Sequence, residues 1–436
     1  MSQPPRMRAL PARKTAVLSA LDVGTSKIVC LIAKLDPVET PEALRGRTHR
    51  CRILGIGHQR SAGLKGGVIV DLEAAEGAIR RAVDAAERMA GVQVESVIVN
   101  ITGGRIGSQH YNAAVRIGGE RAVAESDVHR VLEACAARTQ GQGKAVLHSL
   151  PTGFSIGDMR NVRDPKGMMC DELGADMHVV SGDATAVRNL MLAVERCHLA
   201  VEGVVATPYA AGLAALVDDE VELGTTVVDM GGGTTSFAVF AGGSLVHVDA
   251  VAVGGNHVTM DIARGFNTRL ADAERLKTLY GACITSVSDE RETVAVTLAG
   301  EDGDHPTHVP KSQLVRIIRP RVEEILELVR DRLKTAGFAS NSSSRIILTG
   351  GASQMTGMAE SAKRILSGQV RLGRPLGIQG LPESAKSPSF SASVGLLIYP
   401  QAAKIEYFRP RRRVAGDANG THGYFARVGQ WLRESF

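Results

Sequence analysis

Thr225-Thr-Val-Val-Asp-Met-Gly-Gly-Gly-Thr-Thr235 is the stretch that decides the fold of this chain of 436 residues. A β-branched run leads into Asp229, and an apolar run from Phe237 to Phe240 follows the glycines and threonines. Glycines lack a Cβ, so backbone N–H groups can approach an anion and point at it. A carboxylate at the end of a strand can hold a hydrated divalent cation. The stretch predicts either a β-hairpin that binds phosphate groups or a plain hairpin with a glycine-rich turn.

A similar pattern occurs near the start of the chain, where Leu21-Asp-Val-Gly-Thr-Ser-Lys27 lies between two apolar runs. Asp22 and Asp229 are 207 residues apart, in opposite halves of the chain, and an internal duplication explains the similarity. Two phosphate hairpins that face each other would place a nucleotide between two similar domains. We expect phosphate contacts from Asp22, Gly24, Thr25, Ser26, Lys27, Asp229, Gly231, Gly232, Gly233, Thr234 and Thr235. Asp22 and Asp229 are also the candidates for holding Mg²⁺ through water.

The composition is that of a globular protein with more than one domain. A chain of 436 residues exceeds what one core supports, and its 44% apolar and 22% charged content is ordinary. The six cysteines are scattered without a C-x-x-C pair, so neither a zinc site nor a disulfide framework is predicted, and a reducing cytoplasm fits best. No apolar run approaches the length of a transmembrane helix, and the N-terminus lacks the apolar segment of a signal peptide.

The positive charge is concentrated at the two ends. Residues 1–14 carry four basic residues and no acid, and residues 401–436 carry seven basic against three acidic residues. Each end therefore contributes +4 to a total of +5, which leaves −3 for the chain between them. This distribution argues against nucleic-acid binding by the body and predicts an acidic partner or surface for the ends. Residues 1–14 are interpreted as a disordered basic arm.

Hydrophobic periodicity places several further elements. Asp71 is a candidate N-cap for a helix that runs to Ala90 and stops at Gly91. Residues 91–180 predict short strands around a helix at about 125–138, as in an inserted subdomain. Two helices of small residues, from Tyr209 to Val217 and from Ser389 to Tyr399, suit either a close crossing between domains or simple core packing.

Two more segments complete the second half of the chain. A long helix is expected from about Lys311 to Ala336, which Pro320 either kinks or divides. Arg345-Ile-Ile-Leu-Thr-Gly-Gly-Ala-Ser-Gln354 predicts a strand, a glycine pair and the start of a helix. A backbone without side chains at Gly350 and Gly351 would let a flat base or ribose lie against it.

Five pieces occur in the order typical of the actin-like ATPase superfamily, namely a phosphate hairpin, a connecting helix, a second hairpin, an adenosine motif and a second connecting helix. The chain resembles the FtsA family of bacterial division proteins more than its relatives. The resemblance rests on Val228–Thr234, Ile347–Ala352, Ala193–Cys197, Gly281 and Val394–Leu397, and it covers about residues 16–400 and the last fourteen. It implies an α/β, actin-like (ribonuclease H-like) two-domain fold with a nucleotide cleft.

The resemblance also implies a division into subdomains. These are subdomain 1A at 15–90, 181–207 and 390–403, the family's inserted subdomain 1C at 91–180, subdomain 2A at 208–256 and 321–389, and subdomain 2B at 257–320. The superfamily's ribose and adenine contacts fall on Glu274 and Lys277, for which an exposed helix face is the alternative interpretation. The adenosine site implied in this way consists of Glu274, Lys277, Gly350, Gly351, Ala352 and Gln354, with ATP as the nucleotide.

The C-terminal tail predicts a membrane contact. At about 100° per residue, the apolar side chains of 423–436 fall within an arc of roughly 140° on a helix. Apolar residues with flanking arginines suit a helix in a bilayer interface, whereas packing on the protein itself is the alternative. The expected membrane contacts are Phe425, Val428, Trp431, Leu432 and Phe436, with Arg427 and Arg433. Residues 404–422 contain a basic cluster and predict a flexible linker.

The resemblance, together with these features, implies an ATP-binding protein that polymerises head to tail at the cytoplasmic face of the inner membrane, as a peripheral protein at the division septum. The tail would anchor the polymer to anionic lipids, and the resemblance implies contacts of 1C with later division proteins. It also implies that the C-terminal peptide of FtsZ binds 257–320, with Arg316, Arg319 and Arg321 as candidates near the start of the long helix. No catalytic base is identified, which favours slow ATP hydrolysis as a switch. A soluble sugar or small-molecule kinase of the same superfamily is the alternative.

Overall fold

The computed structural model describes residues 4–7, 9–38, 44, 47–103, 105–118, 121–139, 143–300, 306–338, 344–403 and 406–407. The membrane contacts expected at Phe425, Arg427, Val428, Trp431, Leu432, Arg433 and Phe436 lie outside these residues, as does most of the predicted linker.

The first domain is built on a six-stranded sheet with the order β11-β6-β1-β2-β3-β19. Antiparallel pairing joins β1 to β2 and β2 to β3, whereas β1, β6 and β11 run parallel. The strands are β1 (Ala16–Val23), β2 (Lys27–Pro37), β3 (His49–Arg60), β6 (Ser96–Ile101), β11 (Ala200–Ala206) and β19 (Ile378–Gln379).

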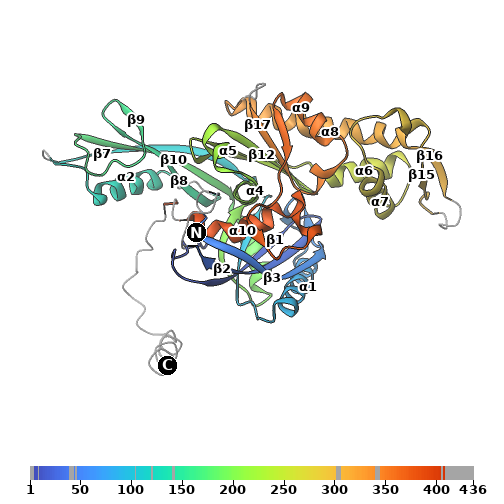
Figure 1. The fold of residues 1–436 in the computed structure, drawn as a ribbon, viewed down its shortest axis with the longest axis horizontal. Coiled ribbons are helices and arrows are strands. Elements are labelled where there is room, and N and C mark those ends of the chain that lie inside the picture. The colour runs from blue at the N-terminus through green and yellow to red at the C-terminus, as the bar shows by residue number, and fades with distance from the viewer. Residues whose placement is uncertain are drawn as a thin grey trace.

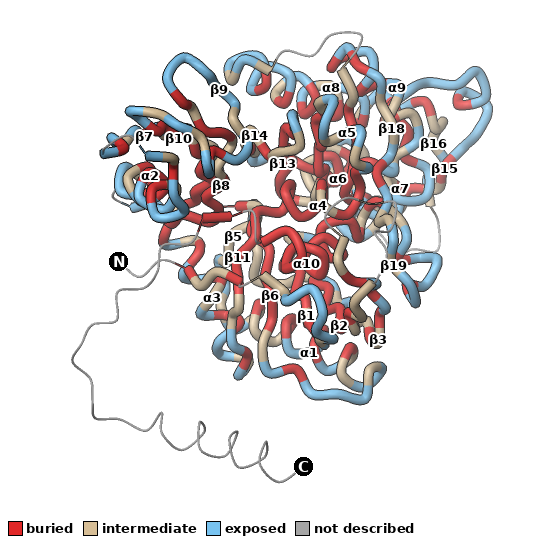
Figure 2. The backbone as a smooth tube through the Cα atoms, turned by 60° about the vertical axis from the view of Figure 1, so that its left-hand side comes forward, coloured by how far each residue is buried: buried red, intermediate tan, exposed pale blue. Residues whose placement is uncertain are grey.

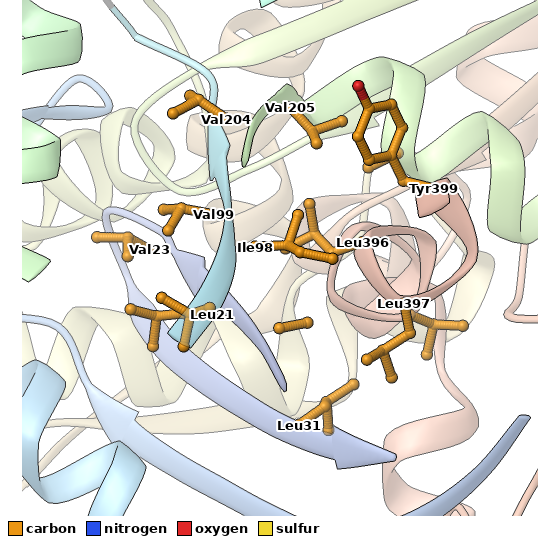
Figure 3. Close-up of a cluster of buried hydrophobic side chains, with 14 of the residues drawn as sticks. Leu21, Val23, Leu31, Ile98, Val99, Val204, Val205, Leu396, Leu397 and Tyr399 are labelled. Carbon is orange, nitrogen blue, oxygen red and sulfur yellow. The ribbon is translucent and has the colours of Figure 1, made fainter. Parts of the chain in front are cut away.

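Helices cover both faces of this sheet. Helix α1 (Leu72–Ala90) packs directly on β3. The two elements are so close that a Cβ on Gly57 of β3 would lie 1.7 Å from the carbonyl oxygen of Ala82 in α1. The predicted ends of α1 are confirmed, since Asp71 accepts the Ala74 N–H and Gly91 has a φ of 69°. Helix α10 (Ser391–Ala402) packs on β1 and β2, and α3 (Ala184–Glu195) completes the domain. Figure 3 shows α10 residues among the core side chains of the sheet, with Leu396 beside Ile98 and Tyr399 beside Val205.

The second domain repeats the arrangement of the first. Its five-stranded sheet has the order β14-β13-β12-β17-β18, with two antiparallel pairs followed by two parallel pairs. The sequence β3-β2-β1-β6-β11 of the first domain has the same succession of directions. The shared topology supports the internal duplication inferred from the two hairpins. The strands are β12 (Thr225–Met230), β13 (Thr235–Ala241), β14 (Ser244–Val251), β17 (Arg345–Thr349) and β18 (Gln369–Leu372).

A helical layer and a small hairpin complete the second domain (Figure 1). Its helices are α6 (Gly255–Gly265), α7 (Leu270–Tyr280), α8 (Lys311–Thr335) and α9 (Met358–Leu366), and β15 (Thr293–Val296) pairs with β16 (Thr307–Pro310). Pro320 lies inside α8, which continues through it as one helix. The predicted boundary between 2B and 2A at 320 and 321 therefore falls within a continuous element. Short elements connect these parts, namely β4 (Leu64–Lys65), β5 (Val68–Ile69), α5 (Asp218–Leu223) and 3-10 helices at Val287–Glu290, Gly351–Gln354, Glu383–Lys386 and Pro388–Phe390.

The inserted subdomain projects from one side of the molecule (Figure 1) and has its own core. Its four-stranded sheet has the order β7-β10-β8-β9, and α2 (Glu125–Ala137) packs on β7 and β10. The strands are β7 (Gly107–Arg116), β8 (Lys144–Ile156), β9 (Met159–Val162) and β10 (Glu172–Asp183). The expected start at residue 91 is too early, because β6 belongs to the large sheet between β1 and β11. Both partners of β6 are far away in sequence, so local periodicity could not assign it.

Helices α4 (Thr207–Ala215) and α10 cross closely at the centre of the molecule, where Figure 2 shows buried chain. A Cβ on Gly395 of α10 would lie 1.7 Å from the carbonyl oxygen of Ala210 in α4. The small residues of both helices are therefore needed for this approach. One hydrophobic core includes residues of α4, α10 and both large sheets.

The N-terminal arm is not disordered where the structure describes it. The side chain of Met7 is 9% exposed and belongs to the main core, and the Leu10 N–H donates to the carbonyl oxygen of Pro400 at 3.0 Å. The predicted linker is also partly fixed, because Glu406 and Tyr407 are buried. Both corrections have one cause: apolar or hydrogen-bonding side chains of these segments find partners in the body that the local sequence does not reveal.

Candidate functional site

The two glycine-containing hairpins have the same turn geometry. The Gly24 N–H donates to the carbonyl oxygen of Lys27 at 3.0 Å, and the Gly231 N–H donates to that of Thr234 at 2.9 Å. Each glycine follows its aspartate by two residues. The turns face each other across the two domains, since a Cβ on Gly232 would lie 1.9 Å from Ser26 Oγ. Glycine is therefore required where the hairpins meet.

A cleft of about 760 Å³ opens beside this contact and reaches from the hairpins to α7 and the Gly350 loop. The cleft is lined by sixteen of the seventeen residues predicted for the phosphates and the adenosine, namely Asp22, Gly24, Thr25, Ser26, Lys27, Asp229, Gly231, Gly232, Gly233, Thr234, Glu274, Lys277, Gly350, Gly351, Ala352 and Gln354. Thr235 is the exception, because its buried hydroxyl donates to the carbonyl oxygen of Val253 at 2.9 Å.

Asp22 is held at the end of β1 by two hydrogen bonds. Asn100 Nδ2 donates to Oδ1 and Ser393 Oγ donates to Oδ2, each at 2.6 Å. Burial raises the pKa of Asp22, although the Ser393 hydroxyl, the charge of Lys27 and the Asn100 amide act in the opposite direction. The carboxylate is therefore fixed in position and short of compensating positive charge.

Asp229 occupies the equivalent place at the end of β12. Thr349 Oγ1 donates to its Oδ1 at 3.0 Å. Burial, followed by the charge of Asp22, raises the pKa of Asp229 to about 6. Burial raises the pKa of both carboxylates, and the charge of Asp22 also raises that of Asp229. A divalent cation would favour their charged forms, so the pair fits such an ion. No group of three or more His, Cys, Asp or Glu residues in the described ranges could hold a metal ion. The two aspartates thus suit a largely hydrated Mg²⁺.

Lys27 provides the positive charge of the first hairpin. Burial lowers its pKa to about 8, while Asp22 and Asp229 act in the opposite direction. Its Nζ lies 3.6 Å from the centre of the Phe390 ring, a cation–π contact that orients the ammonium group. Lys27 and Phe390 both line the cleft.

The first turn of α6 is tied to the second hairpin. The N–H groups of Gly255 and Asn256 donate to the carbonyl oxygens of Gly231 and Gly232, at 2.9 and 2.7 Å. Ser26 Oγ of the first hairpin donates to Asn256 Oδ1 at 3.1 Å. This contact links the two domains directly, so a change at the hairpins can alter their relative position.

At the other end of the cleft, Lys277 and Glu274 form a compact network on α7. Lys277 Nζ donates to Glu274 Oε2 at 2.6 Å, to Thr259 Oγ1 at 2.8 Å and to the carbonyl oxygen of Gly255 at 3.1 Å. The side chain of Lys277 is 12% exposed and that of Glu274 is 48% exposed. The pair therefore lines the cleft, and the alternative of a fully exposed helix face does not apply to Lys277.

The Gly350 loop offers bare backbone to the same end of the cleft. Gly350 has a φ of 84°, and a Cβ there would lie 2.5 Å from the carbonyl oxygen of Met230. At Gly351 a Cβ would meet nothing closer than 3.9 Å, so the space beside it is open. Leu279 and Tyr280 line this end with partly exposed side chains and can cover a flat ring.

Sequence reasoning missed several residues of the site. Asn100 and Ser393 hold Asp22, Phe390 orients Lys27, and Asn256 bridges the domains. Asn100 could have been identified from the sequence, because it is the polar residue near the end of the apolar run Val97-Ile-Val-Asn-Ile101. The other three have no local signal, since their partners are more than 200 residues away.

The three arginines proposed for a peptide contact are all ion-paired on α8. Arg316 pairs with Glu290 at 3.4 Å and Arg319 with Glu323 at 2.8 Å. Arg321 holds Asp261 with Nε at 2.6 Å and also contacts Glu324, and its side chain is only 26% exposed. Arg321 is therefore a structural cation, whereas Arg316 and Arg319 remain accessible.

Two domains of matching topology around a cleft, joined by crossing helices, define the actin-like fold class. A chain of the solved PilM–PilN type IV pilus biogenesis complex has the same fold, with a TM-score of 0.59, 16% identity and coverage of 88% of this chain and 98% of that chain.

The chain belongs to the FtsA family of cell division proteins. It is 52% identical to Cell division protein FtsA of Agrobacterium fabrum, over 99% of this chain and 98% of the relative, and 32% identical to that of Escherichia coli K12, over 98% and 100%. The model of the family "Cell division protein FtsA" matches residues 226–395. The model of the "SHS2 domain inserted in FTSA" matches residues 103–181, which agrees with an insertion that begins after β6. The chain thus has a role in cell division.

Proposed function

We propose that this protein binds ATP and Mg²⁺ in the cleft and, in that state, polymerises head to tail at the cytoplasmic face of the inner membrane. There it tethers FtsZ filaments and recruits later division proteins at the septum. The observation that carries the proposal is the pair of matching hairpins, with Asp22 and Asp229 buried at one cleft between two domains. A ligand that touches both hairpins changes the relation between the domains, and this is what a switch requires.

In this proposal, different parts of the cleft bind the phosphates, the Mg²⁺ ion and the adenosine. Lys27 and the hydroxyls of Thr25 and Thr234 contact the phosphates, together with the N–H groups of the glycine turns. Asp22 and Asp229 orient water molecules of Mg²⁺. The base and ribose lie between α7 and the Gly350 loop. ATP hydrolysis is slow in this proposal, because no described side chain is assigned as the base for the attacking water.

The proposed membrane contact rests on the last fourteen residues. None of the described helices is both long enough and apolar enough to span a bilayer. A helix over 423–436 would bury Trp431 and its apolar neighbours in the bilayer interface, with Arg427 and Arg433 at the headgroups. Anionic lipids would strengthen this contact.

The proposed partners bind at two ends of the molecule. Arg316 and Arg319, exposed at the start of α8, offer charge to the acidic C-terminal peptide of FtsZ, although each must exchange its present carboxylate partner. The inserted subdomain, which projects away from this helix in Figure 1, would contact later division proteins or the next subunit. The kinase alternative is disfavoured by 52% identity to a division protein over nearly the whole chain.

Co-sedimentation with FtsZ on anionic liposomes tests the proposal. FtsZ should pellet with the vesicles only when this protein is present, and ATP should increase the amount of pelleted protein. An FtsZ lacking its C-terminal peptide is the matched control and should stay in the supernatant. Recruitment that is equal with and without the peptide would refute the assigned partner, and no effect of ATP would refute the switch.

A further inference from the structure

One end of the six-stranded sheet carries cations that neither the cleft nor the tail uses. Strand pairing sets Val17 opposite Lys34, and Lys34 opposite Arg52. In the next row Asp36 is opposite Arg50 and accepts a hydrogen bond from Thr15 Oγ1 at 3.3 Å. Alternate residues of a strand face the same side, so both rows share one face. We define the basic edge as the cations of these rows, Lys34, Arg50 and Arg52, together with Arg13 and Lys14, which precede Thr15 in the adjoining arm.

The basic edge has an excess of positive charge. Asp36 is the one carboxylate within the two rows, and it pairs with Lys34 at 2.8 Å. Arg13, Lys14 and Arg52 are exposed and form no ion pair with any residue in the described ranges. These three cations add positive charge that no described carboxylate pairs with, whereas the chain between the two ends carries −3 overall.

An apolar side chain lies beside these charges. Val17 is 52% exposed, and it borders a groove of about 300 Å³ that Val92 also lines. Glu95 and Glu202 line the same groove on the side of β6, so they bound the basic edge in that direction. Exposed cations around an exposed apolar side chain are the composition of a surface that rests on lipid headgroups.

The N-terminal arm connects the basic edge with the place where the C-terminal tail leaves the body. Arg6 Nη1 donates to the carbonyl oxygen of Tyr407 at 3.2 Å, and the Leu10 N–H donates to that of Pro400 at 3.0 Å. The carbonyl oxygen of Lys14 contacts His49 Nε2 at 3.1 Å, at the start of β3. Arg13 is seven positions after Arg6, so the first residue of the basic edge lies within about 25 Å of the arginine that contacts Tyr407.

We propose that the basic edge is a second contact of this protein with an anionic membrane surface, in addition to the tail; the proposal rests on the membrane tethering inferred above. The tail beyond Tyr407 contains fifteen residues before 423, a segment whose end-to-end distance as a random coil is about 20 Å. A tail helix at the end of such a segment would be able to reach the same membrane plane as the basic edge. Two linked contacts bind more tightly than either alone and fix how the body is turned toward the membrane.

The experiment compares full-length variants on vesicles of phosphatidylglycerol and of phosphatidylcholine. The triple variant Arg13→Gln, Lys14→Gln and Arg52→Gln removes three exposed cations of the basic edge. The matched control, Arg291→Gln, Arg330→Gln and Lys334→Gln, removes three exposed cations of the second domain. A third chain ends at Tyr407 and keeps the basic edge without the tail. Thermal unfolding of each chain verifies that it is folded.

Each cation near an anionic leaflet changes affinity by about fivefold, so the triple variant should need on the order of 100-fold more phosphatidylglycerol for half-maximal binding. The control should bind like the unchanged chain. The chain ending at Tyr407 should retain weak binding that is lost in about 0.5 M salt.

Three results would overturn the inference. If the triple variant and the unchanged chain bind equally while the truncated chain does not bind, the tail is the anchor and the basic edge is not. If the triple variant loses affinity for duplex DNA and keeps its affinity for vesicles, the surface binds nucleic acid instead. If the full-length chain does not bind phosphatidylglycerol vesicles, both the membrane contact of the basic edge and the proposed tethering are refuted.

Discussion

Replacing Asp229 with asparagine should stabilise the unliganded protein and remove its response to ATP. The carboxylate is buried, with Asp22 as an additional repulsive charge, and its pKa rises from 3.8 to about 6 on folding. An acid whose pKa is higher in the folded state binds its proton more tightly there, so its ionisation opposes folding. Asparagine keeps the shape and can still accept the hydrogen bond of Thr349 without carrying a charge.

The size of the effect follows from the two pKa values. A difference of about two units corresponds to about 3 kcal/mol at pH 7, where the folded protein must ionise Asp229. The gain should shrink as the pH falls through 6. It should be below about 1 kcal/mol near pH 4, where the group is protonated in the folded state and is itself partly protonated in the unfolded state. For a domain of roughly 200 residues, about 3 kcal/mol raises Tm by about 6–12 °C.

Thermal unfolding followed by circular dichroism, with and without ATP and Mg²⁺, measures both effects. The unchanged protein should gain Tm from the ligand, and the Asp229→Asn variant should start higher and gain nothing. Asp261→Asn is the matched control, because Asp261 is ion-paired with Arg321 at 2.6 Å and lies outside the cleft lining. It should leave the ligand response intact. A less stable Asp229→Asn variant at pH 7, or one that retains its ligand response, would refute the reasoning.

Three further predictions concern the supports of the cleft and the tail. Gly395→Ala places a methyl group 1.7 Å from the Ala210 carbonyl oxygen, so it should force α4 and α10 apart and lower stability by about 1–3 kcal/mol in a denaturant titration. Met7→Ala should cost about 2 kcal/mol and speed tryptic cleavage at Arg13, because the arm loses its buried side chain. Trp431→Glu should prevent flotation with anionic vesicles while leaving the Tm response to ATP unchanged, and normal flotation would exclude the tail helix.

The sequence by itself determined the parts of the molecule whose chemistry is local. Glycine turns after Asp22 and Asp229, the cap at Asp71 and the stop at Gly91 depend on neighbouring residues, and all of them form as predicted. The repeated hairpin also indicated the duplication, since the same local pattern generates the same strand pairing in both sheets. Sixteen of the predicted cleft residues meet for this reason, because they lie on these local motifs.

Only the tertiary structure decided which distant residues complete these motifs. Ser393 lies 371 residues from Asp22 and donates to it, and Asn256 lies 230 residues from Ser26 and accepts from it. Strand β6 belongs to the large sheet and the arm joins the core for the same reason, as their partners come from other parts of the chain. A hydrogen bond or a buried contact across such separations depends on how the two domains pack. Sequence patterns specify turns and faces, whereas packing specifies which faces meet.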